Sequence, residues 1–394
     1  MRLIVLCICV FAVSISYASN LNCNIKNKDD ICLNDYIKNS KTKLIKIPER
    51  NYVISSPIIL TSNSVFDGSN AIFISNLTNN KPMFLFESLN NVVIKNLRII
   101  GNGAFLESSS QSVKLCGFSN GNSGLLLTNS KNIVITNISI SGMEFGIFLN
   151  GSFQNPIINI DVNNNMLSNL GEAGIRVVYG KNIQISDNQI ERVLGNQTPC
   201  MPNWISNSKF ADGVYLENSE SVFISKNTIK NVKRIGIVLD NRANSSGQLL
   251  VANNHVLIKN NIISNVNDCR GTENNAGIWV EPWQESRNIN KIESIEILHN
   301  KIDNQGAITC NKYQLGIFSG ADNSIVENNE ISNFSQQGKR SVGIRCAYGN
   351  CNIVNNKIYN TNIGILLSDT AESISYQLEN NQIHANFDSV VHNK

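Results

Sequence analysis

Hydrophobic and polar residues alternate with a period of two in short segments that recur along most of the chain. One pattern, apolar-x-apolar-x-x-Asn-x-apolar, occurs with its Asn at Asn165, Asn188, Asn227, Asn261, Asn300, Asn329, Asn356 and Asn381. Period-two alternation is typical of β-strands, so each copy predicts two short strands on either side of a fixed corner. Successive Asn residues lie 23 to 39 positions apart, a spacing that indicates a solenoid.

The residues that flank each Asn predict the core of this solenoid. The position two after the Asn and the position three before it are always Val, Ile or Leu. This β-branched content and the period of two disfavour a helical solenoid. An Asn at the same corner of every coil can bond its neighbours above and below, which allows a buried polar row. We therefore predict a parallel β-helix of about ten coils, with Leu97 and Ile138 at the Asn position in earlier coils.

A second template follows each variable segment and begins with Gly and an apolar residue. Its glycines are Gly146, Gly174, Gly213, Gly236, Gly277, Gly316, Gly343 and Gly364. Alternation directs the residues one and three after each Gly, such as Ile278 and Val280, into the core. The residues two and four after it, such as Trp279 and Glu281, are then expected to face solvent on one outer surface.

The N-terminal part of the chain resembles a known family. Asp29-Asp30-Ile31 with an amphipathic stretch to Lys38, followed by residues 47–52 and 57–60, resembles the capping helix and first strands of the pectate lyase superfamily. The Asn row resembles the Asn ladder of that superfamily. The resemblance covers nearly all of the chain after its N-terminal segment. It implies an all-β, single-stranded right-handed parallel β-helix with three sheets and an N-terminal capping helix, in which the Gly-Ile strands form the first sheet and carry the substrate cleft.

The first residues have the features of a signal peptide. Arg2 precedes an apolar run from Leu3 to Val13, and Ser16-Tyr17-Ala18 places small residues at a cleavage site after Ala18. The run is shorter than the ~20 residues that cross a bilayer. We expect residues 1–18 to be removed, 19–60 to form the cap and first strands, and 61–394 to form the β-helix. The mature protein is expected to be secreted, extracellular or periplasmic, without membrane insertion.

The charge of the chain argues against nucleic acid as a partner. There are 33 Lys and Arg and 30 Asp and Glu, and removing Arg2 with the signal peptide brings the two nearer to balance. No long basic run is present to bind phosphates. We expect a monomer.

Eight cysteines remain after residue 18, and an even number in an exported chain indicates disulfides. Buried free thiols are the alternative. The predicted pairs are Cys23–Cys32, Cys346–Cys351 and Cys269–Cys310, which leaves Cys116 with Cys200.

Three acidic residues occupy the position four after Gly in successive coils: Glu217, Asp240 and Glu281. Neighbouring strands lie ~4.8 Å apart, so these side chains form a column of like charges. Such a column requires a proton, a cation or an arginine to be stable. Paired carboxylates at such separations hydrolyse glycosides. The column is therefore the predicted catalytic centre, with ordinary solvated surface as the alternative.

Aromatic and cationic residues surround this column in the predicted structure. The position two after Gly and the adjoining loops supply the predicted glycan contacts, which are Arg176, Tyr215, Trp279, Trp283, Phe318, Arg345, Lys209 and Arg242. Sugar rings stack on aromatic faces and sugar hydroxyls bond to charged groups, so the predicted ligand is a polysaccharide or other glycan. Aromatic residues that instead pack beneath the loops are the alternative.

Asp212-Gly213-Val214 resembles part of the first catalytic motif of the polygalacturonase family, which makes Asp212 a fourth catalytic candidate. The next coil has Arg234-Ile235 where that family has paired Asp, and the following coil has Ala276 where it has His. These departures put the polygalacturonase mechanism in doubt.

Three classes of function stay open from the sequence. The first is a glycan-cleaving enzyme. As a hydrolase it needs no cofactor, with Glu281 or Glu217 as the acid and Asp240 as the base. As a lyase it holds calcium on Glu217, Asp240 and Glu281 and uses a cationic side chain such as Lys209 or Arg242 as the base. The others are a non-catalytic glycan-binding or adhesion protein and a purely structural β-helix.

Overall fold

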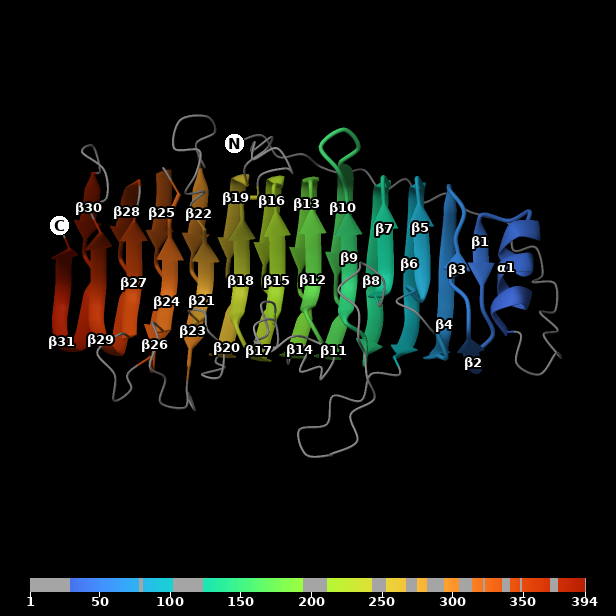
Figure 1. Cartoon of the computed structure of the whole chain (residues 1–394), viewed down its shortest axis with the longest axis horizontal. Coiled ribbons are helices and arrows are strands. Elements are labelled where there is room, and N and C mark those ends of the chain that lie inside the picture. The colour runs from blue at the N-terminus through green and yellow to red at the C-terminus, as the bar shows by residue number, and fades with distance from the viewer. Residues whose placement is uncertain are drawn as a thin grey trace, which may run out of the picture.

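The computed structural model describes residues 29–77, 81–101, 123–193, 211–242, 253–266, 275–281, 294–304, 314–321, 323–334, 341–347, 349–368 and 375–393. All its strand pairs are parallel, and each strand between the two ends pairs with strands of the preceding and following coils. The result is a β-helix whose three sheets run the length of the molecule, with a helix at one end and the C-terminal strands at the other (Figure 1). The predicted fold class is confirmed.

Helix α1 (Asp29–Asn39) covers the N-terminal end of the β-helix. Asp29 and Asp30 lie in its first turn, where the helix dipole favours negative charge. Leu33 and Ile37 lie one turn apart and are buried in the core of the first coil. The Asp29 carboxylate accepts hydrogen bonds from Arg50 and from the backbone of Val53, which joins the helix to the first strands. The helix therefore caps the core as predicted.

The first sheet contains the strands of the Gly-Ile template and the strands stacked with them. They are β3 (Ile58–Ile59), β5 (Phe84–Glu87), β7 (Ser123–Thr128), β9 (Phe145–Asn150), β12 (Ala173–Val178), β15 (Asp212–Glu217), β18 (Ile235–Asp240), β21 (Asn275–Val280), β24 (Gln314–Ser319), β27 (Ser341–Ala347) and the second halves of β29 (Lys357–Ser368) and β31 (Gln382–Asn393).

The second sheet follows the first along each coil. It consists of β1 (Leu44–Lys46), the first halves of β4 (Ser64–Ser75), β6 (Asn90–Ile100) and β8 (Lys131–Ser141), then β10 (Ile157–Asn163), β13 (Gly180–Ser186), β16 (Glu220–Ser225), β19 (Asn254–Lys259), β22 (Ile295–Leu298), β25 (Asn323–Glu327), β28 (Asn350–Val354) and β30 (Tyr376–Glu379).

The third sheet completes each coil. It consists of β2 (Asn51–Ile54), the second halves of β4, β6 and β8, then β11 (Met166–Leu170), β14 (Gln189–Val193), β17 (Thr228–Val232), β20 (Ile262–Val266), β23 (Lys301–Asp303), β26 (Glu330–Ser332) and the first halves of β29 and β31.

The Asn of the repeat lies at the corner between the second and third sheets. Asn188 donates from Nδ2 to Asn227 Oδ1 at 3.0 Å, and Asn227 donates in the same way to Asn261 at 3.0 Å. Each amide also donates to a backbone carbonyl of the preceding coil, as Asn227 does to Ile185 at 2.9 Å. The residue before the Asn, for example Lys226 with φ 55°, has a left-handed conformation that turns the chain. The predicted ladder is confirmed.

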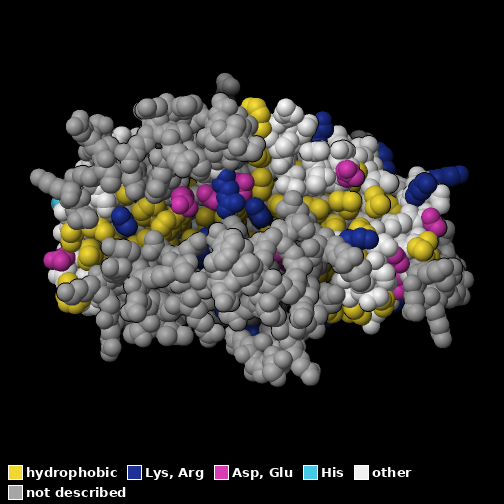
Figure 2. Space-filling view, in the orientation of Figure 1, with side chains coloured by type: hydrophobic (Ala, Val, Ile, Leu, Met, Phe, Trp, Pro, Cys, Tyr) yellow, Lys and Arg dark blue, Asp and Glu magenta, His cyan; other side chains and the backbone are white. Residues whose placement is uncertain are grey.

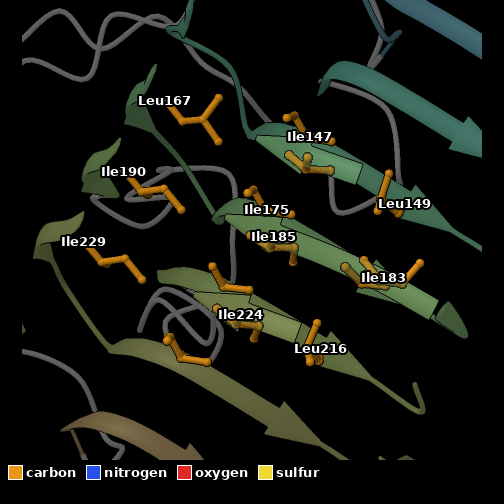
Figure 3. Close-up of a cluster of buried hydrophobic side chains, with 14 of the residues drawn as sticks. Ile147, Leu149, Leu167, Ile175, Ile183, Ile185, Ile190, Leu216, Ile224 and Ile229 are labelled. Atoms are coloured by element: carbon orange, nitrogen blue, oxygen red, sulfur yellow. The ribbon is translucent and has the colours of Figure 1, made fainter. Parts of the chain in front are cut away.

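The core consists of like side chains stacked in rows, one from each coil (Figure 3). Leu167, Ile190 and Ile229, each two residues after a ladder Asn, form one such row inside the third sheet. Ile278, Val280, Ile297 and Ile302 are buried, as the alternation predicts. This agreement confirms the register on which the outer surface of the first sheet was assigned.

Cys346 and Cys351 form the predicted disulfide between β27 and β28. Cys32 is also disulfide-bonded, and its predicted partner Cys23 lies outside the described residues. The other predicted pairs lie outside them as well. In the described part of the chain, no helix has the length and apolar character needed to cross a membrane.

Candidate functional site

The outer face of the first sheet carries a stripe of apolar side chains with a group of charged residues near its middle (Figure 2). Two apolar clusters occupy this stripe. One contains Phe145 and Phe148, and the other contains Tyr215, Val238 and Phe318. The charged group lies where strands β12, β15 and β18 are neighbours. We call it the Arg-acid cluster; its members are Arg176, Glu217, Asp240 and Arg242.

Glu217 and Asp240 are the last residues of β15 and β18, and the register pairs them directly. Arg242, two residues after Asp240, contacts both. Its Nε lies 2.7 Å from Asp240 Oδ2 and 3.9 Å from Glu217 Oε2. The sum of these two distances is the upper limit for the separation between the two carboxylate oxygens. The two carboxylate side chains are mostly buried, whereas that of Arg242 is 40% exposed.

Arg176 neutralises the same column from the other side. Its Nη2 lies 3.2 Å from Glu217 Oε2. Its guanidinium also lies near three aromatic rings, at 5.1 Å from the centroid of Phe148, 5.3 Å from Tyr215 and 5.7 Å from Phe145. Cation–π contacts of this kind hold a guanidinium in place. Stacked acids can be stabilised by a proton, a cation or an arginine, and in this structure arginine stabilises them.

Tyr215 is 2% exposed and its hydroxyl donates a hydrogen bond to Asp240 Oδ2. Burial and the neighbouring charge of Asp240 raise the pKa of the Tyr215 hydroxyl well above its usual value. Burial lowers the pKa of Arg242, but Tyr215 and the two carboxylates outweigh it and raise that pKa overall. Tyr215 and Arg242 therefore fix the orientation of the Asp240 carboxylate.

Glu281 directly follows β21 at the position that corresponds to Asp240 at the end of β18, so it extends the acidic column by one coil. Its backbone N–H donates to Leu239 at 2.9 Å, and its side chain is partly exposed. The structure thus brings Glu217 and Asp240 together on Arg242 and places Glu281 beside Asp240.

The expected aromatic platforms differ from the prediction in their exposure. Trp279 and Phe318 stack with ring centroids 4.2 Å apart, and Arg345 lies over the Phe318 ring at 5.5 Å. Phe318 and Tyr215 point away from the core, yet both are buried because they pack in an apolar cluster of their own. The expectation that this row faces solvent was therefore wrong for these two residues, and partly exposed Trp279 is the better platform.

Asp212 lies apart from the acidic column. It begins β15, whereas Glu217 ends that strand. Arg234 donates from Nε to its Oδ1 at 2.8 Å, and Arg234 Nη2 bonds its other oxygen. Asp212 is 0% exposed. A buried bidentate ion pair of this kind suits a structural role.

Two predicted contact residues, Trp283 and Lys209, lie outside the described residues. Within the described ranges, no group of three or more His, Cys, Asp or Glu side chains is arranged to hold a metal ion. At Glu217 and Asp240, arginine and tyrosine donors occupy carboxylate oxygens that a calcium ion would require.

Sequence reasoning missed Glu144 and Glu172 at the opposite edge of the first sheet. Both are buried, and each lies two residues before a template Gly in consecutive coils. An acid at the same position before the template Gly in two consecutive coils was the sequence signal that could have identified this pair. The charges of Asp212, Arg176 and Arg234 act on Glu172.

Comparison with known proteins identifies the family. The model of the right-handed β-helix region matches residues 83–197 and 212–393. This chain belongs to the right-handed β-helix family. No curated protein sequence is detectably similar to it. Its fold is the right-handed parallel β-helix that the resemblance implied.

Solved β-helix structures similar to this one include both enzymes and adhesins. The surface protein and adhesin PfbA of Streptococcus pneumoniae has 13% identity and a TM-score of 0.66, and the match covers 93% of this chain and 95% of that one. The GH87 α-1,3-glucanase of Streptomyces thermodiastaticus has 14% identity and a TM-score of 0.60, over 91% and 66% of the two chains. DFA-IIIase from Arthrobacter chlorophenolicus has 13% identity and a TM-score of 0.59, over 87% of each chain. At these identities the similarity shows the fold alone.

Proposed function

We propose that this β-helix protein is an exported enzyme that hydrolyses a polysaccharide on the outer face of its first sheet. The convergence of Glu217 and Asp240 on Arg242 carries the proposal. Stacked, mostly buried carboxylates reduce the stability of a fold because their desolvation and mutual repulsion are unfavourable. A site that nevertheless contains two of them together with two arginines is a candidate functional site. The glucanase among the structurally similar proteins supports a glycan substrate by analogy of fold.

The contacts suggest a division of roles between the acids. The ion pair with Arg242 and the hydrogen bond from Tyr215 hold Asp240 as an oriented carboxylate that can take a proton from water. Glu281 then donates its proton to the glycosidic oxygen. The water oxygen bonds to the anomeric carbon as the bond to the leaving oxygen breaks. In this mechanism Arg176 and Arg242 bind hydroxyl groups of the glycan, and Trp279 stacks on a sugar ring.

One assay tests this proposal. The purified protein is incubated with a panel of glycans, and the release of reducing ends is measured together with the ultraviolet absorbance of unsaturated uronic acids. Hydrolysis gives reducing ends without that absorbance, whereas a lyase gives both. Neither signal on any polymer that the protein binds would contradict the enzyme proposal.

A non-catalytic glycan-binding or adhesion protein is the second candidate. The observation that favours it is the neutralisation of both column acids by arginine, together with the burial of Tyr215 and Phe318. The adhesin among the similar structures has this fold too. Binding of a glycan without cleavage, lost in a Trp279→Ala variant, would favour this candidate.

Export and the monomeric state are part of the same proposal. N-terminal sequencing of the protein from the culture medium should begin at Ser19 if the segment ending at Ala18 is removed. Light scattering should give the mass of one chain.

A further inference from the structure

Glu144 and Glu172 form a buried acidic pair beside the Arg-acid cluster. They directly precede β9 and β12, and Glu172 N–H donates to the backbone carbonyl of Glu144 at 2.7 Å. Their exposures are 4% and 5%. The register of β9 and β12 places them at the same position in consecutive coils, so their carboxyl groups lie about one strand spacing, ~4.8 Å, apart. Two buried carboxylates at this spacing repel each other unless one of them carries a proton.

The surroundings of the pair favour retention of this proton. Burial is the largest cause that raises the pKa of Glu172, and the charge of Asp212 raises it further. The hydrogen bond with Glu144 and the charges of Arg176 and Arg234 act in the opposite direction but do not cancel the rise. Arg234 is paired with Asp212 in a bidentate contact, whereas the charge of Arg176 acts on Glu172 from its ion pair with Glu217. Arg176 is therefore the cation that a change of charge at Glu172 attracts.

We propose that Glu144 and Glu172 share a single proton at neutral pH, and that this proton keeps Arg176 bonded to Glu217. While the pair carries one negative charge, Arg176 stays with Glu217, 3.2 Å from its carboxylate. Loss of the proton places a second buried charge next to Asp212 and draws the Arg176 guanidinium away from Glu217. The pair is therefore a positioning device for the site, and its effect on glycan handling rests on the proposed function.

Glu172→Gln is the diagnostic variant. The amide keeps the size of the side chain and donates a hydrogen bond to Glu144, so the pair never carries more than one negative charge as the pH rises. Glu144→Gln is the reciprocal variant and serves if the first does not fold. Glu220→Gln is the control, because the Glu220 side chain is 39% exposed on the second sheet and paired with Lys181.

The first measurement is the free energy of unfolding as a function of pH. A raised pKa means that the folded protein binds more protons than the unfolded chain at pH values above 4.5 and up to the raised pKa. The stability that this proton supplies is complete below that window and is lost as the pH rises through it. We expect the urea midpoint of the wild type to fall relative to that of Glu172→Gln across the window, while Glu220→Gln follows the wild type. Parallel curves for wild type and Glu172→Gln would overturn the proposal.

The second measurement detects the proton directly. At neutral pH the infrared spectrum of the wild type should contain the carbonyl band of a protonated carboxyl group, which Glu172→Gln lacks and Glu220→Gln keeps. A wild-type spectrum without that band overturns the shared proton. Neither measurement uses a glycan, so both results stand apart from the outcome of the cleavage assay.

The last measurement tests positioning through the affinity of a bound glycan from the panel. Above the window we expect the wild type to lose affinity by roughly tenfold, the size of one charge-assisted hydrogen bond, while Glu172→Gln shows no such loss. A purely structural pair would change the urea midpoint without a difference between the two affinity profiles. If glycan affinity depends on pH in the same way in the wild type and in Glu172→Gln while the infrared band is present, the positioning role is overturned. The shared proton is then still supported.

Discussion

Glu217 and Asp240 lie side by side at the ends of adjacent strands and face the same guanidinium, that of Arg242. The parallel register alone would stack these two charges at the spacing of one strand, an unfavourable arrangement in a partly buried site. Arg176 and Arg242 balance them. The site is therefore an alternation of acids and arginines rather than a row of acids, and removal of any one member leaves a partner with an unbalanced charge.

Asp240→Asn tests the catalytic proposal. The amide keeps the size of the side chain and an oxygen that accepts the Tyr215 hydrogen bond, but it is a poor base. We expect hydrolysis to fall by at least about 100-fold, the contribution of a general base. The free energy of unfolding should change by less than about 1 kcal/mol, because Arg242 is 40% exposed and solvent screens its ion pair. Full activity of the variant on a glycan that the wild type cleaves would refute the assignment.

The ion pair between Asp212 and Arg234 gives a contrasting prediction. Arg234→Met leaves the Asp212 carboxylate buried without its bidentate partner, so we expect a loss of about 3–5 kcal/mol in the free energy of unfolding. Asp212→Asn combined with Arg234→Met should recover much of that loss in urea unfolding. Additive losses in the double variant would show that the two side chains do not act as a pair. Retention of glycan cleavage in the folded double variant would confirm that Asp212 is structural.

The fold was predictable because its determinants are local and repeated. A ladder residue such as Asn227 recurs with the same kind of apolar neighbours in eight coils, so the corner, the two strands and the core side chains of those coils can be predicted from a window of eight residues. The outer register followed from the same alternation, and the structure confirms that Trp279 faces away from the core.

The partners within the site were not predictable in the same way. Arg176 and Glu217 lie 41 residues apart, and which arginine reaches which carboxylate depends on side-chain conformations across coils rather than on the repeat. Alternation also specifies direction but not burial, so the outward Tyr215 was expected to be exposed. Glu144 and Glu172 lie before the template Gly, in a part of each coil where the sequence does not repeat, so the template itself does not point to them.

The template glycines allow the close stacking of the first sheet, as Gly213 shows. A Cβ atom at Gly213 would lie 2.5 Å from the carbonyl oxygen of Gly236 and 2.5 Å from Ile229 Cγ2. The first neighbour is backbone and cannot rotate away. We expect Gly213→Ala to reduce the free energy of unfolding by about 1–3 kcal/mol, as overpacking of a core does. A change below about 0.5 kcal/mol in urea unfolding would show that adjacent coils separate easily at this point.

The Asn ladder gives the last prediction, which compares a buried ladder with an exposed one. Asn227 bonds Asn188, Asn261 and the carbonyl of Ile185 inside the molecule. Asn227→Ala leaves several of these groups buried without partners, so we expect a loss of about 2–4 kcal/mol in the free energy of unfolding, measured by urea denaturation.

Asn182 is the matched control, because it belongs to a ladder on the exposed surface and bonds Asn159 at 3.1 Å. Its φ is 55°, so Gly rather than Ala preserves the backbone conformation. Water replaces the lost hydrogen bond there, and Asn182→Gly should change stability by no more than about 0.5–1 kcal/mol. Equal losses in the two variants would mean that the buried ladder stabilises the fold no more than surface hydrogen bonds do.

The apolar Ile138 occupies the ladder position one coil before Asn165, and its backbone N–H donates to Asn165 Oδ1. Its buried side chain shows that an apolar residue can fill this position. An Asn227→Leu variant should therefore be less stable than wild type but more stable than Asn227→Ala, which also leaves a cavity.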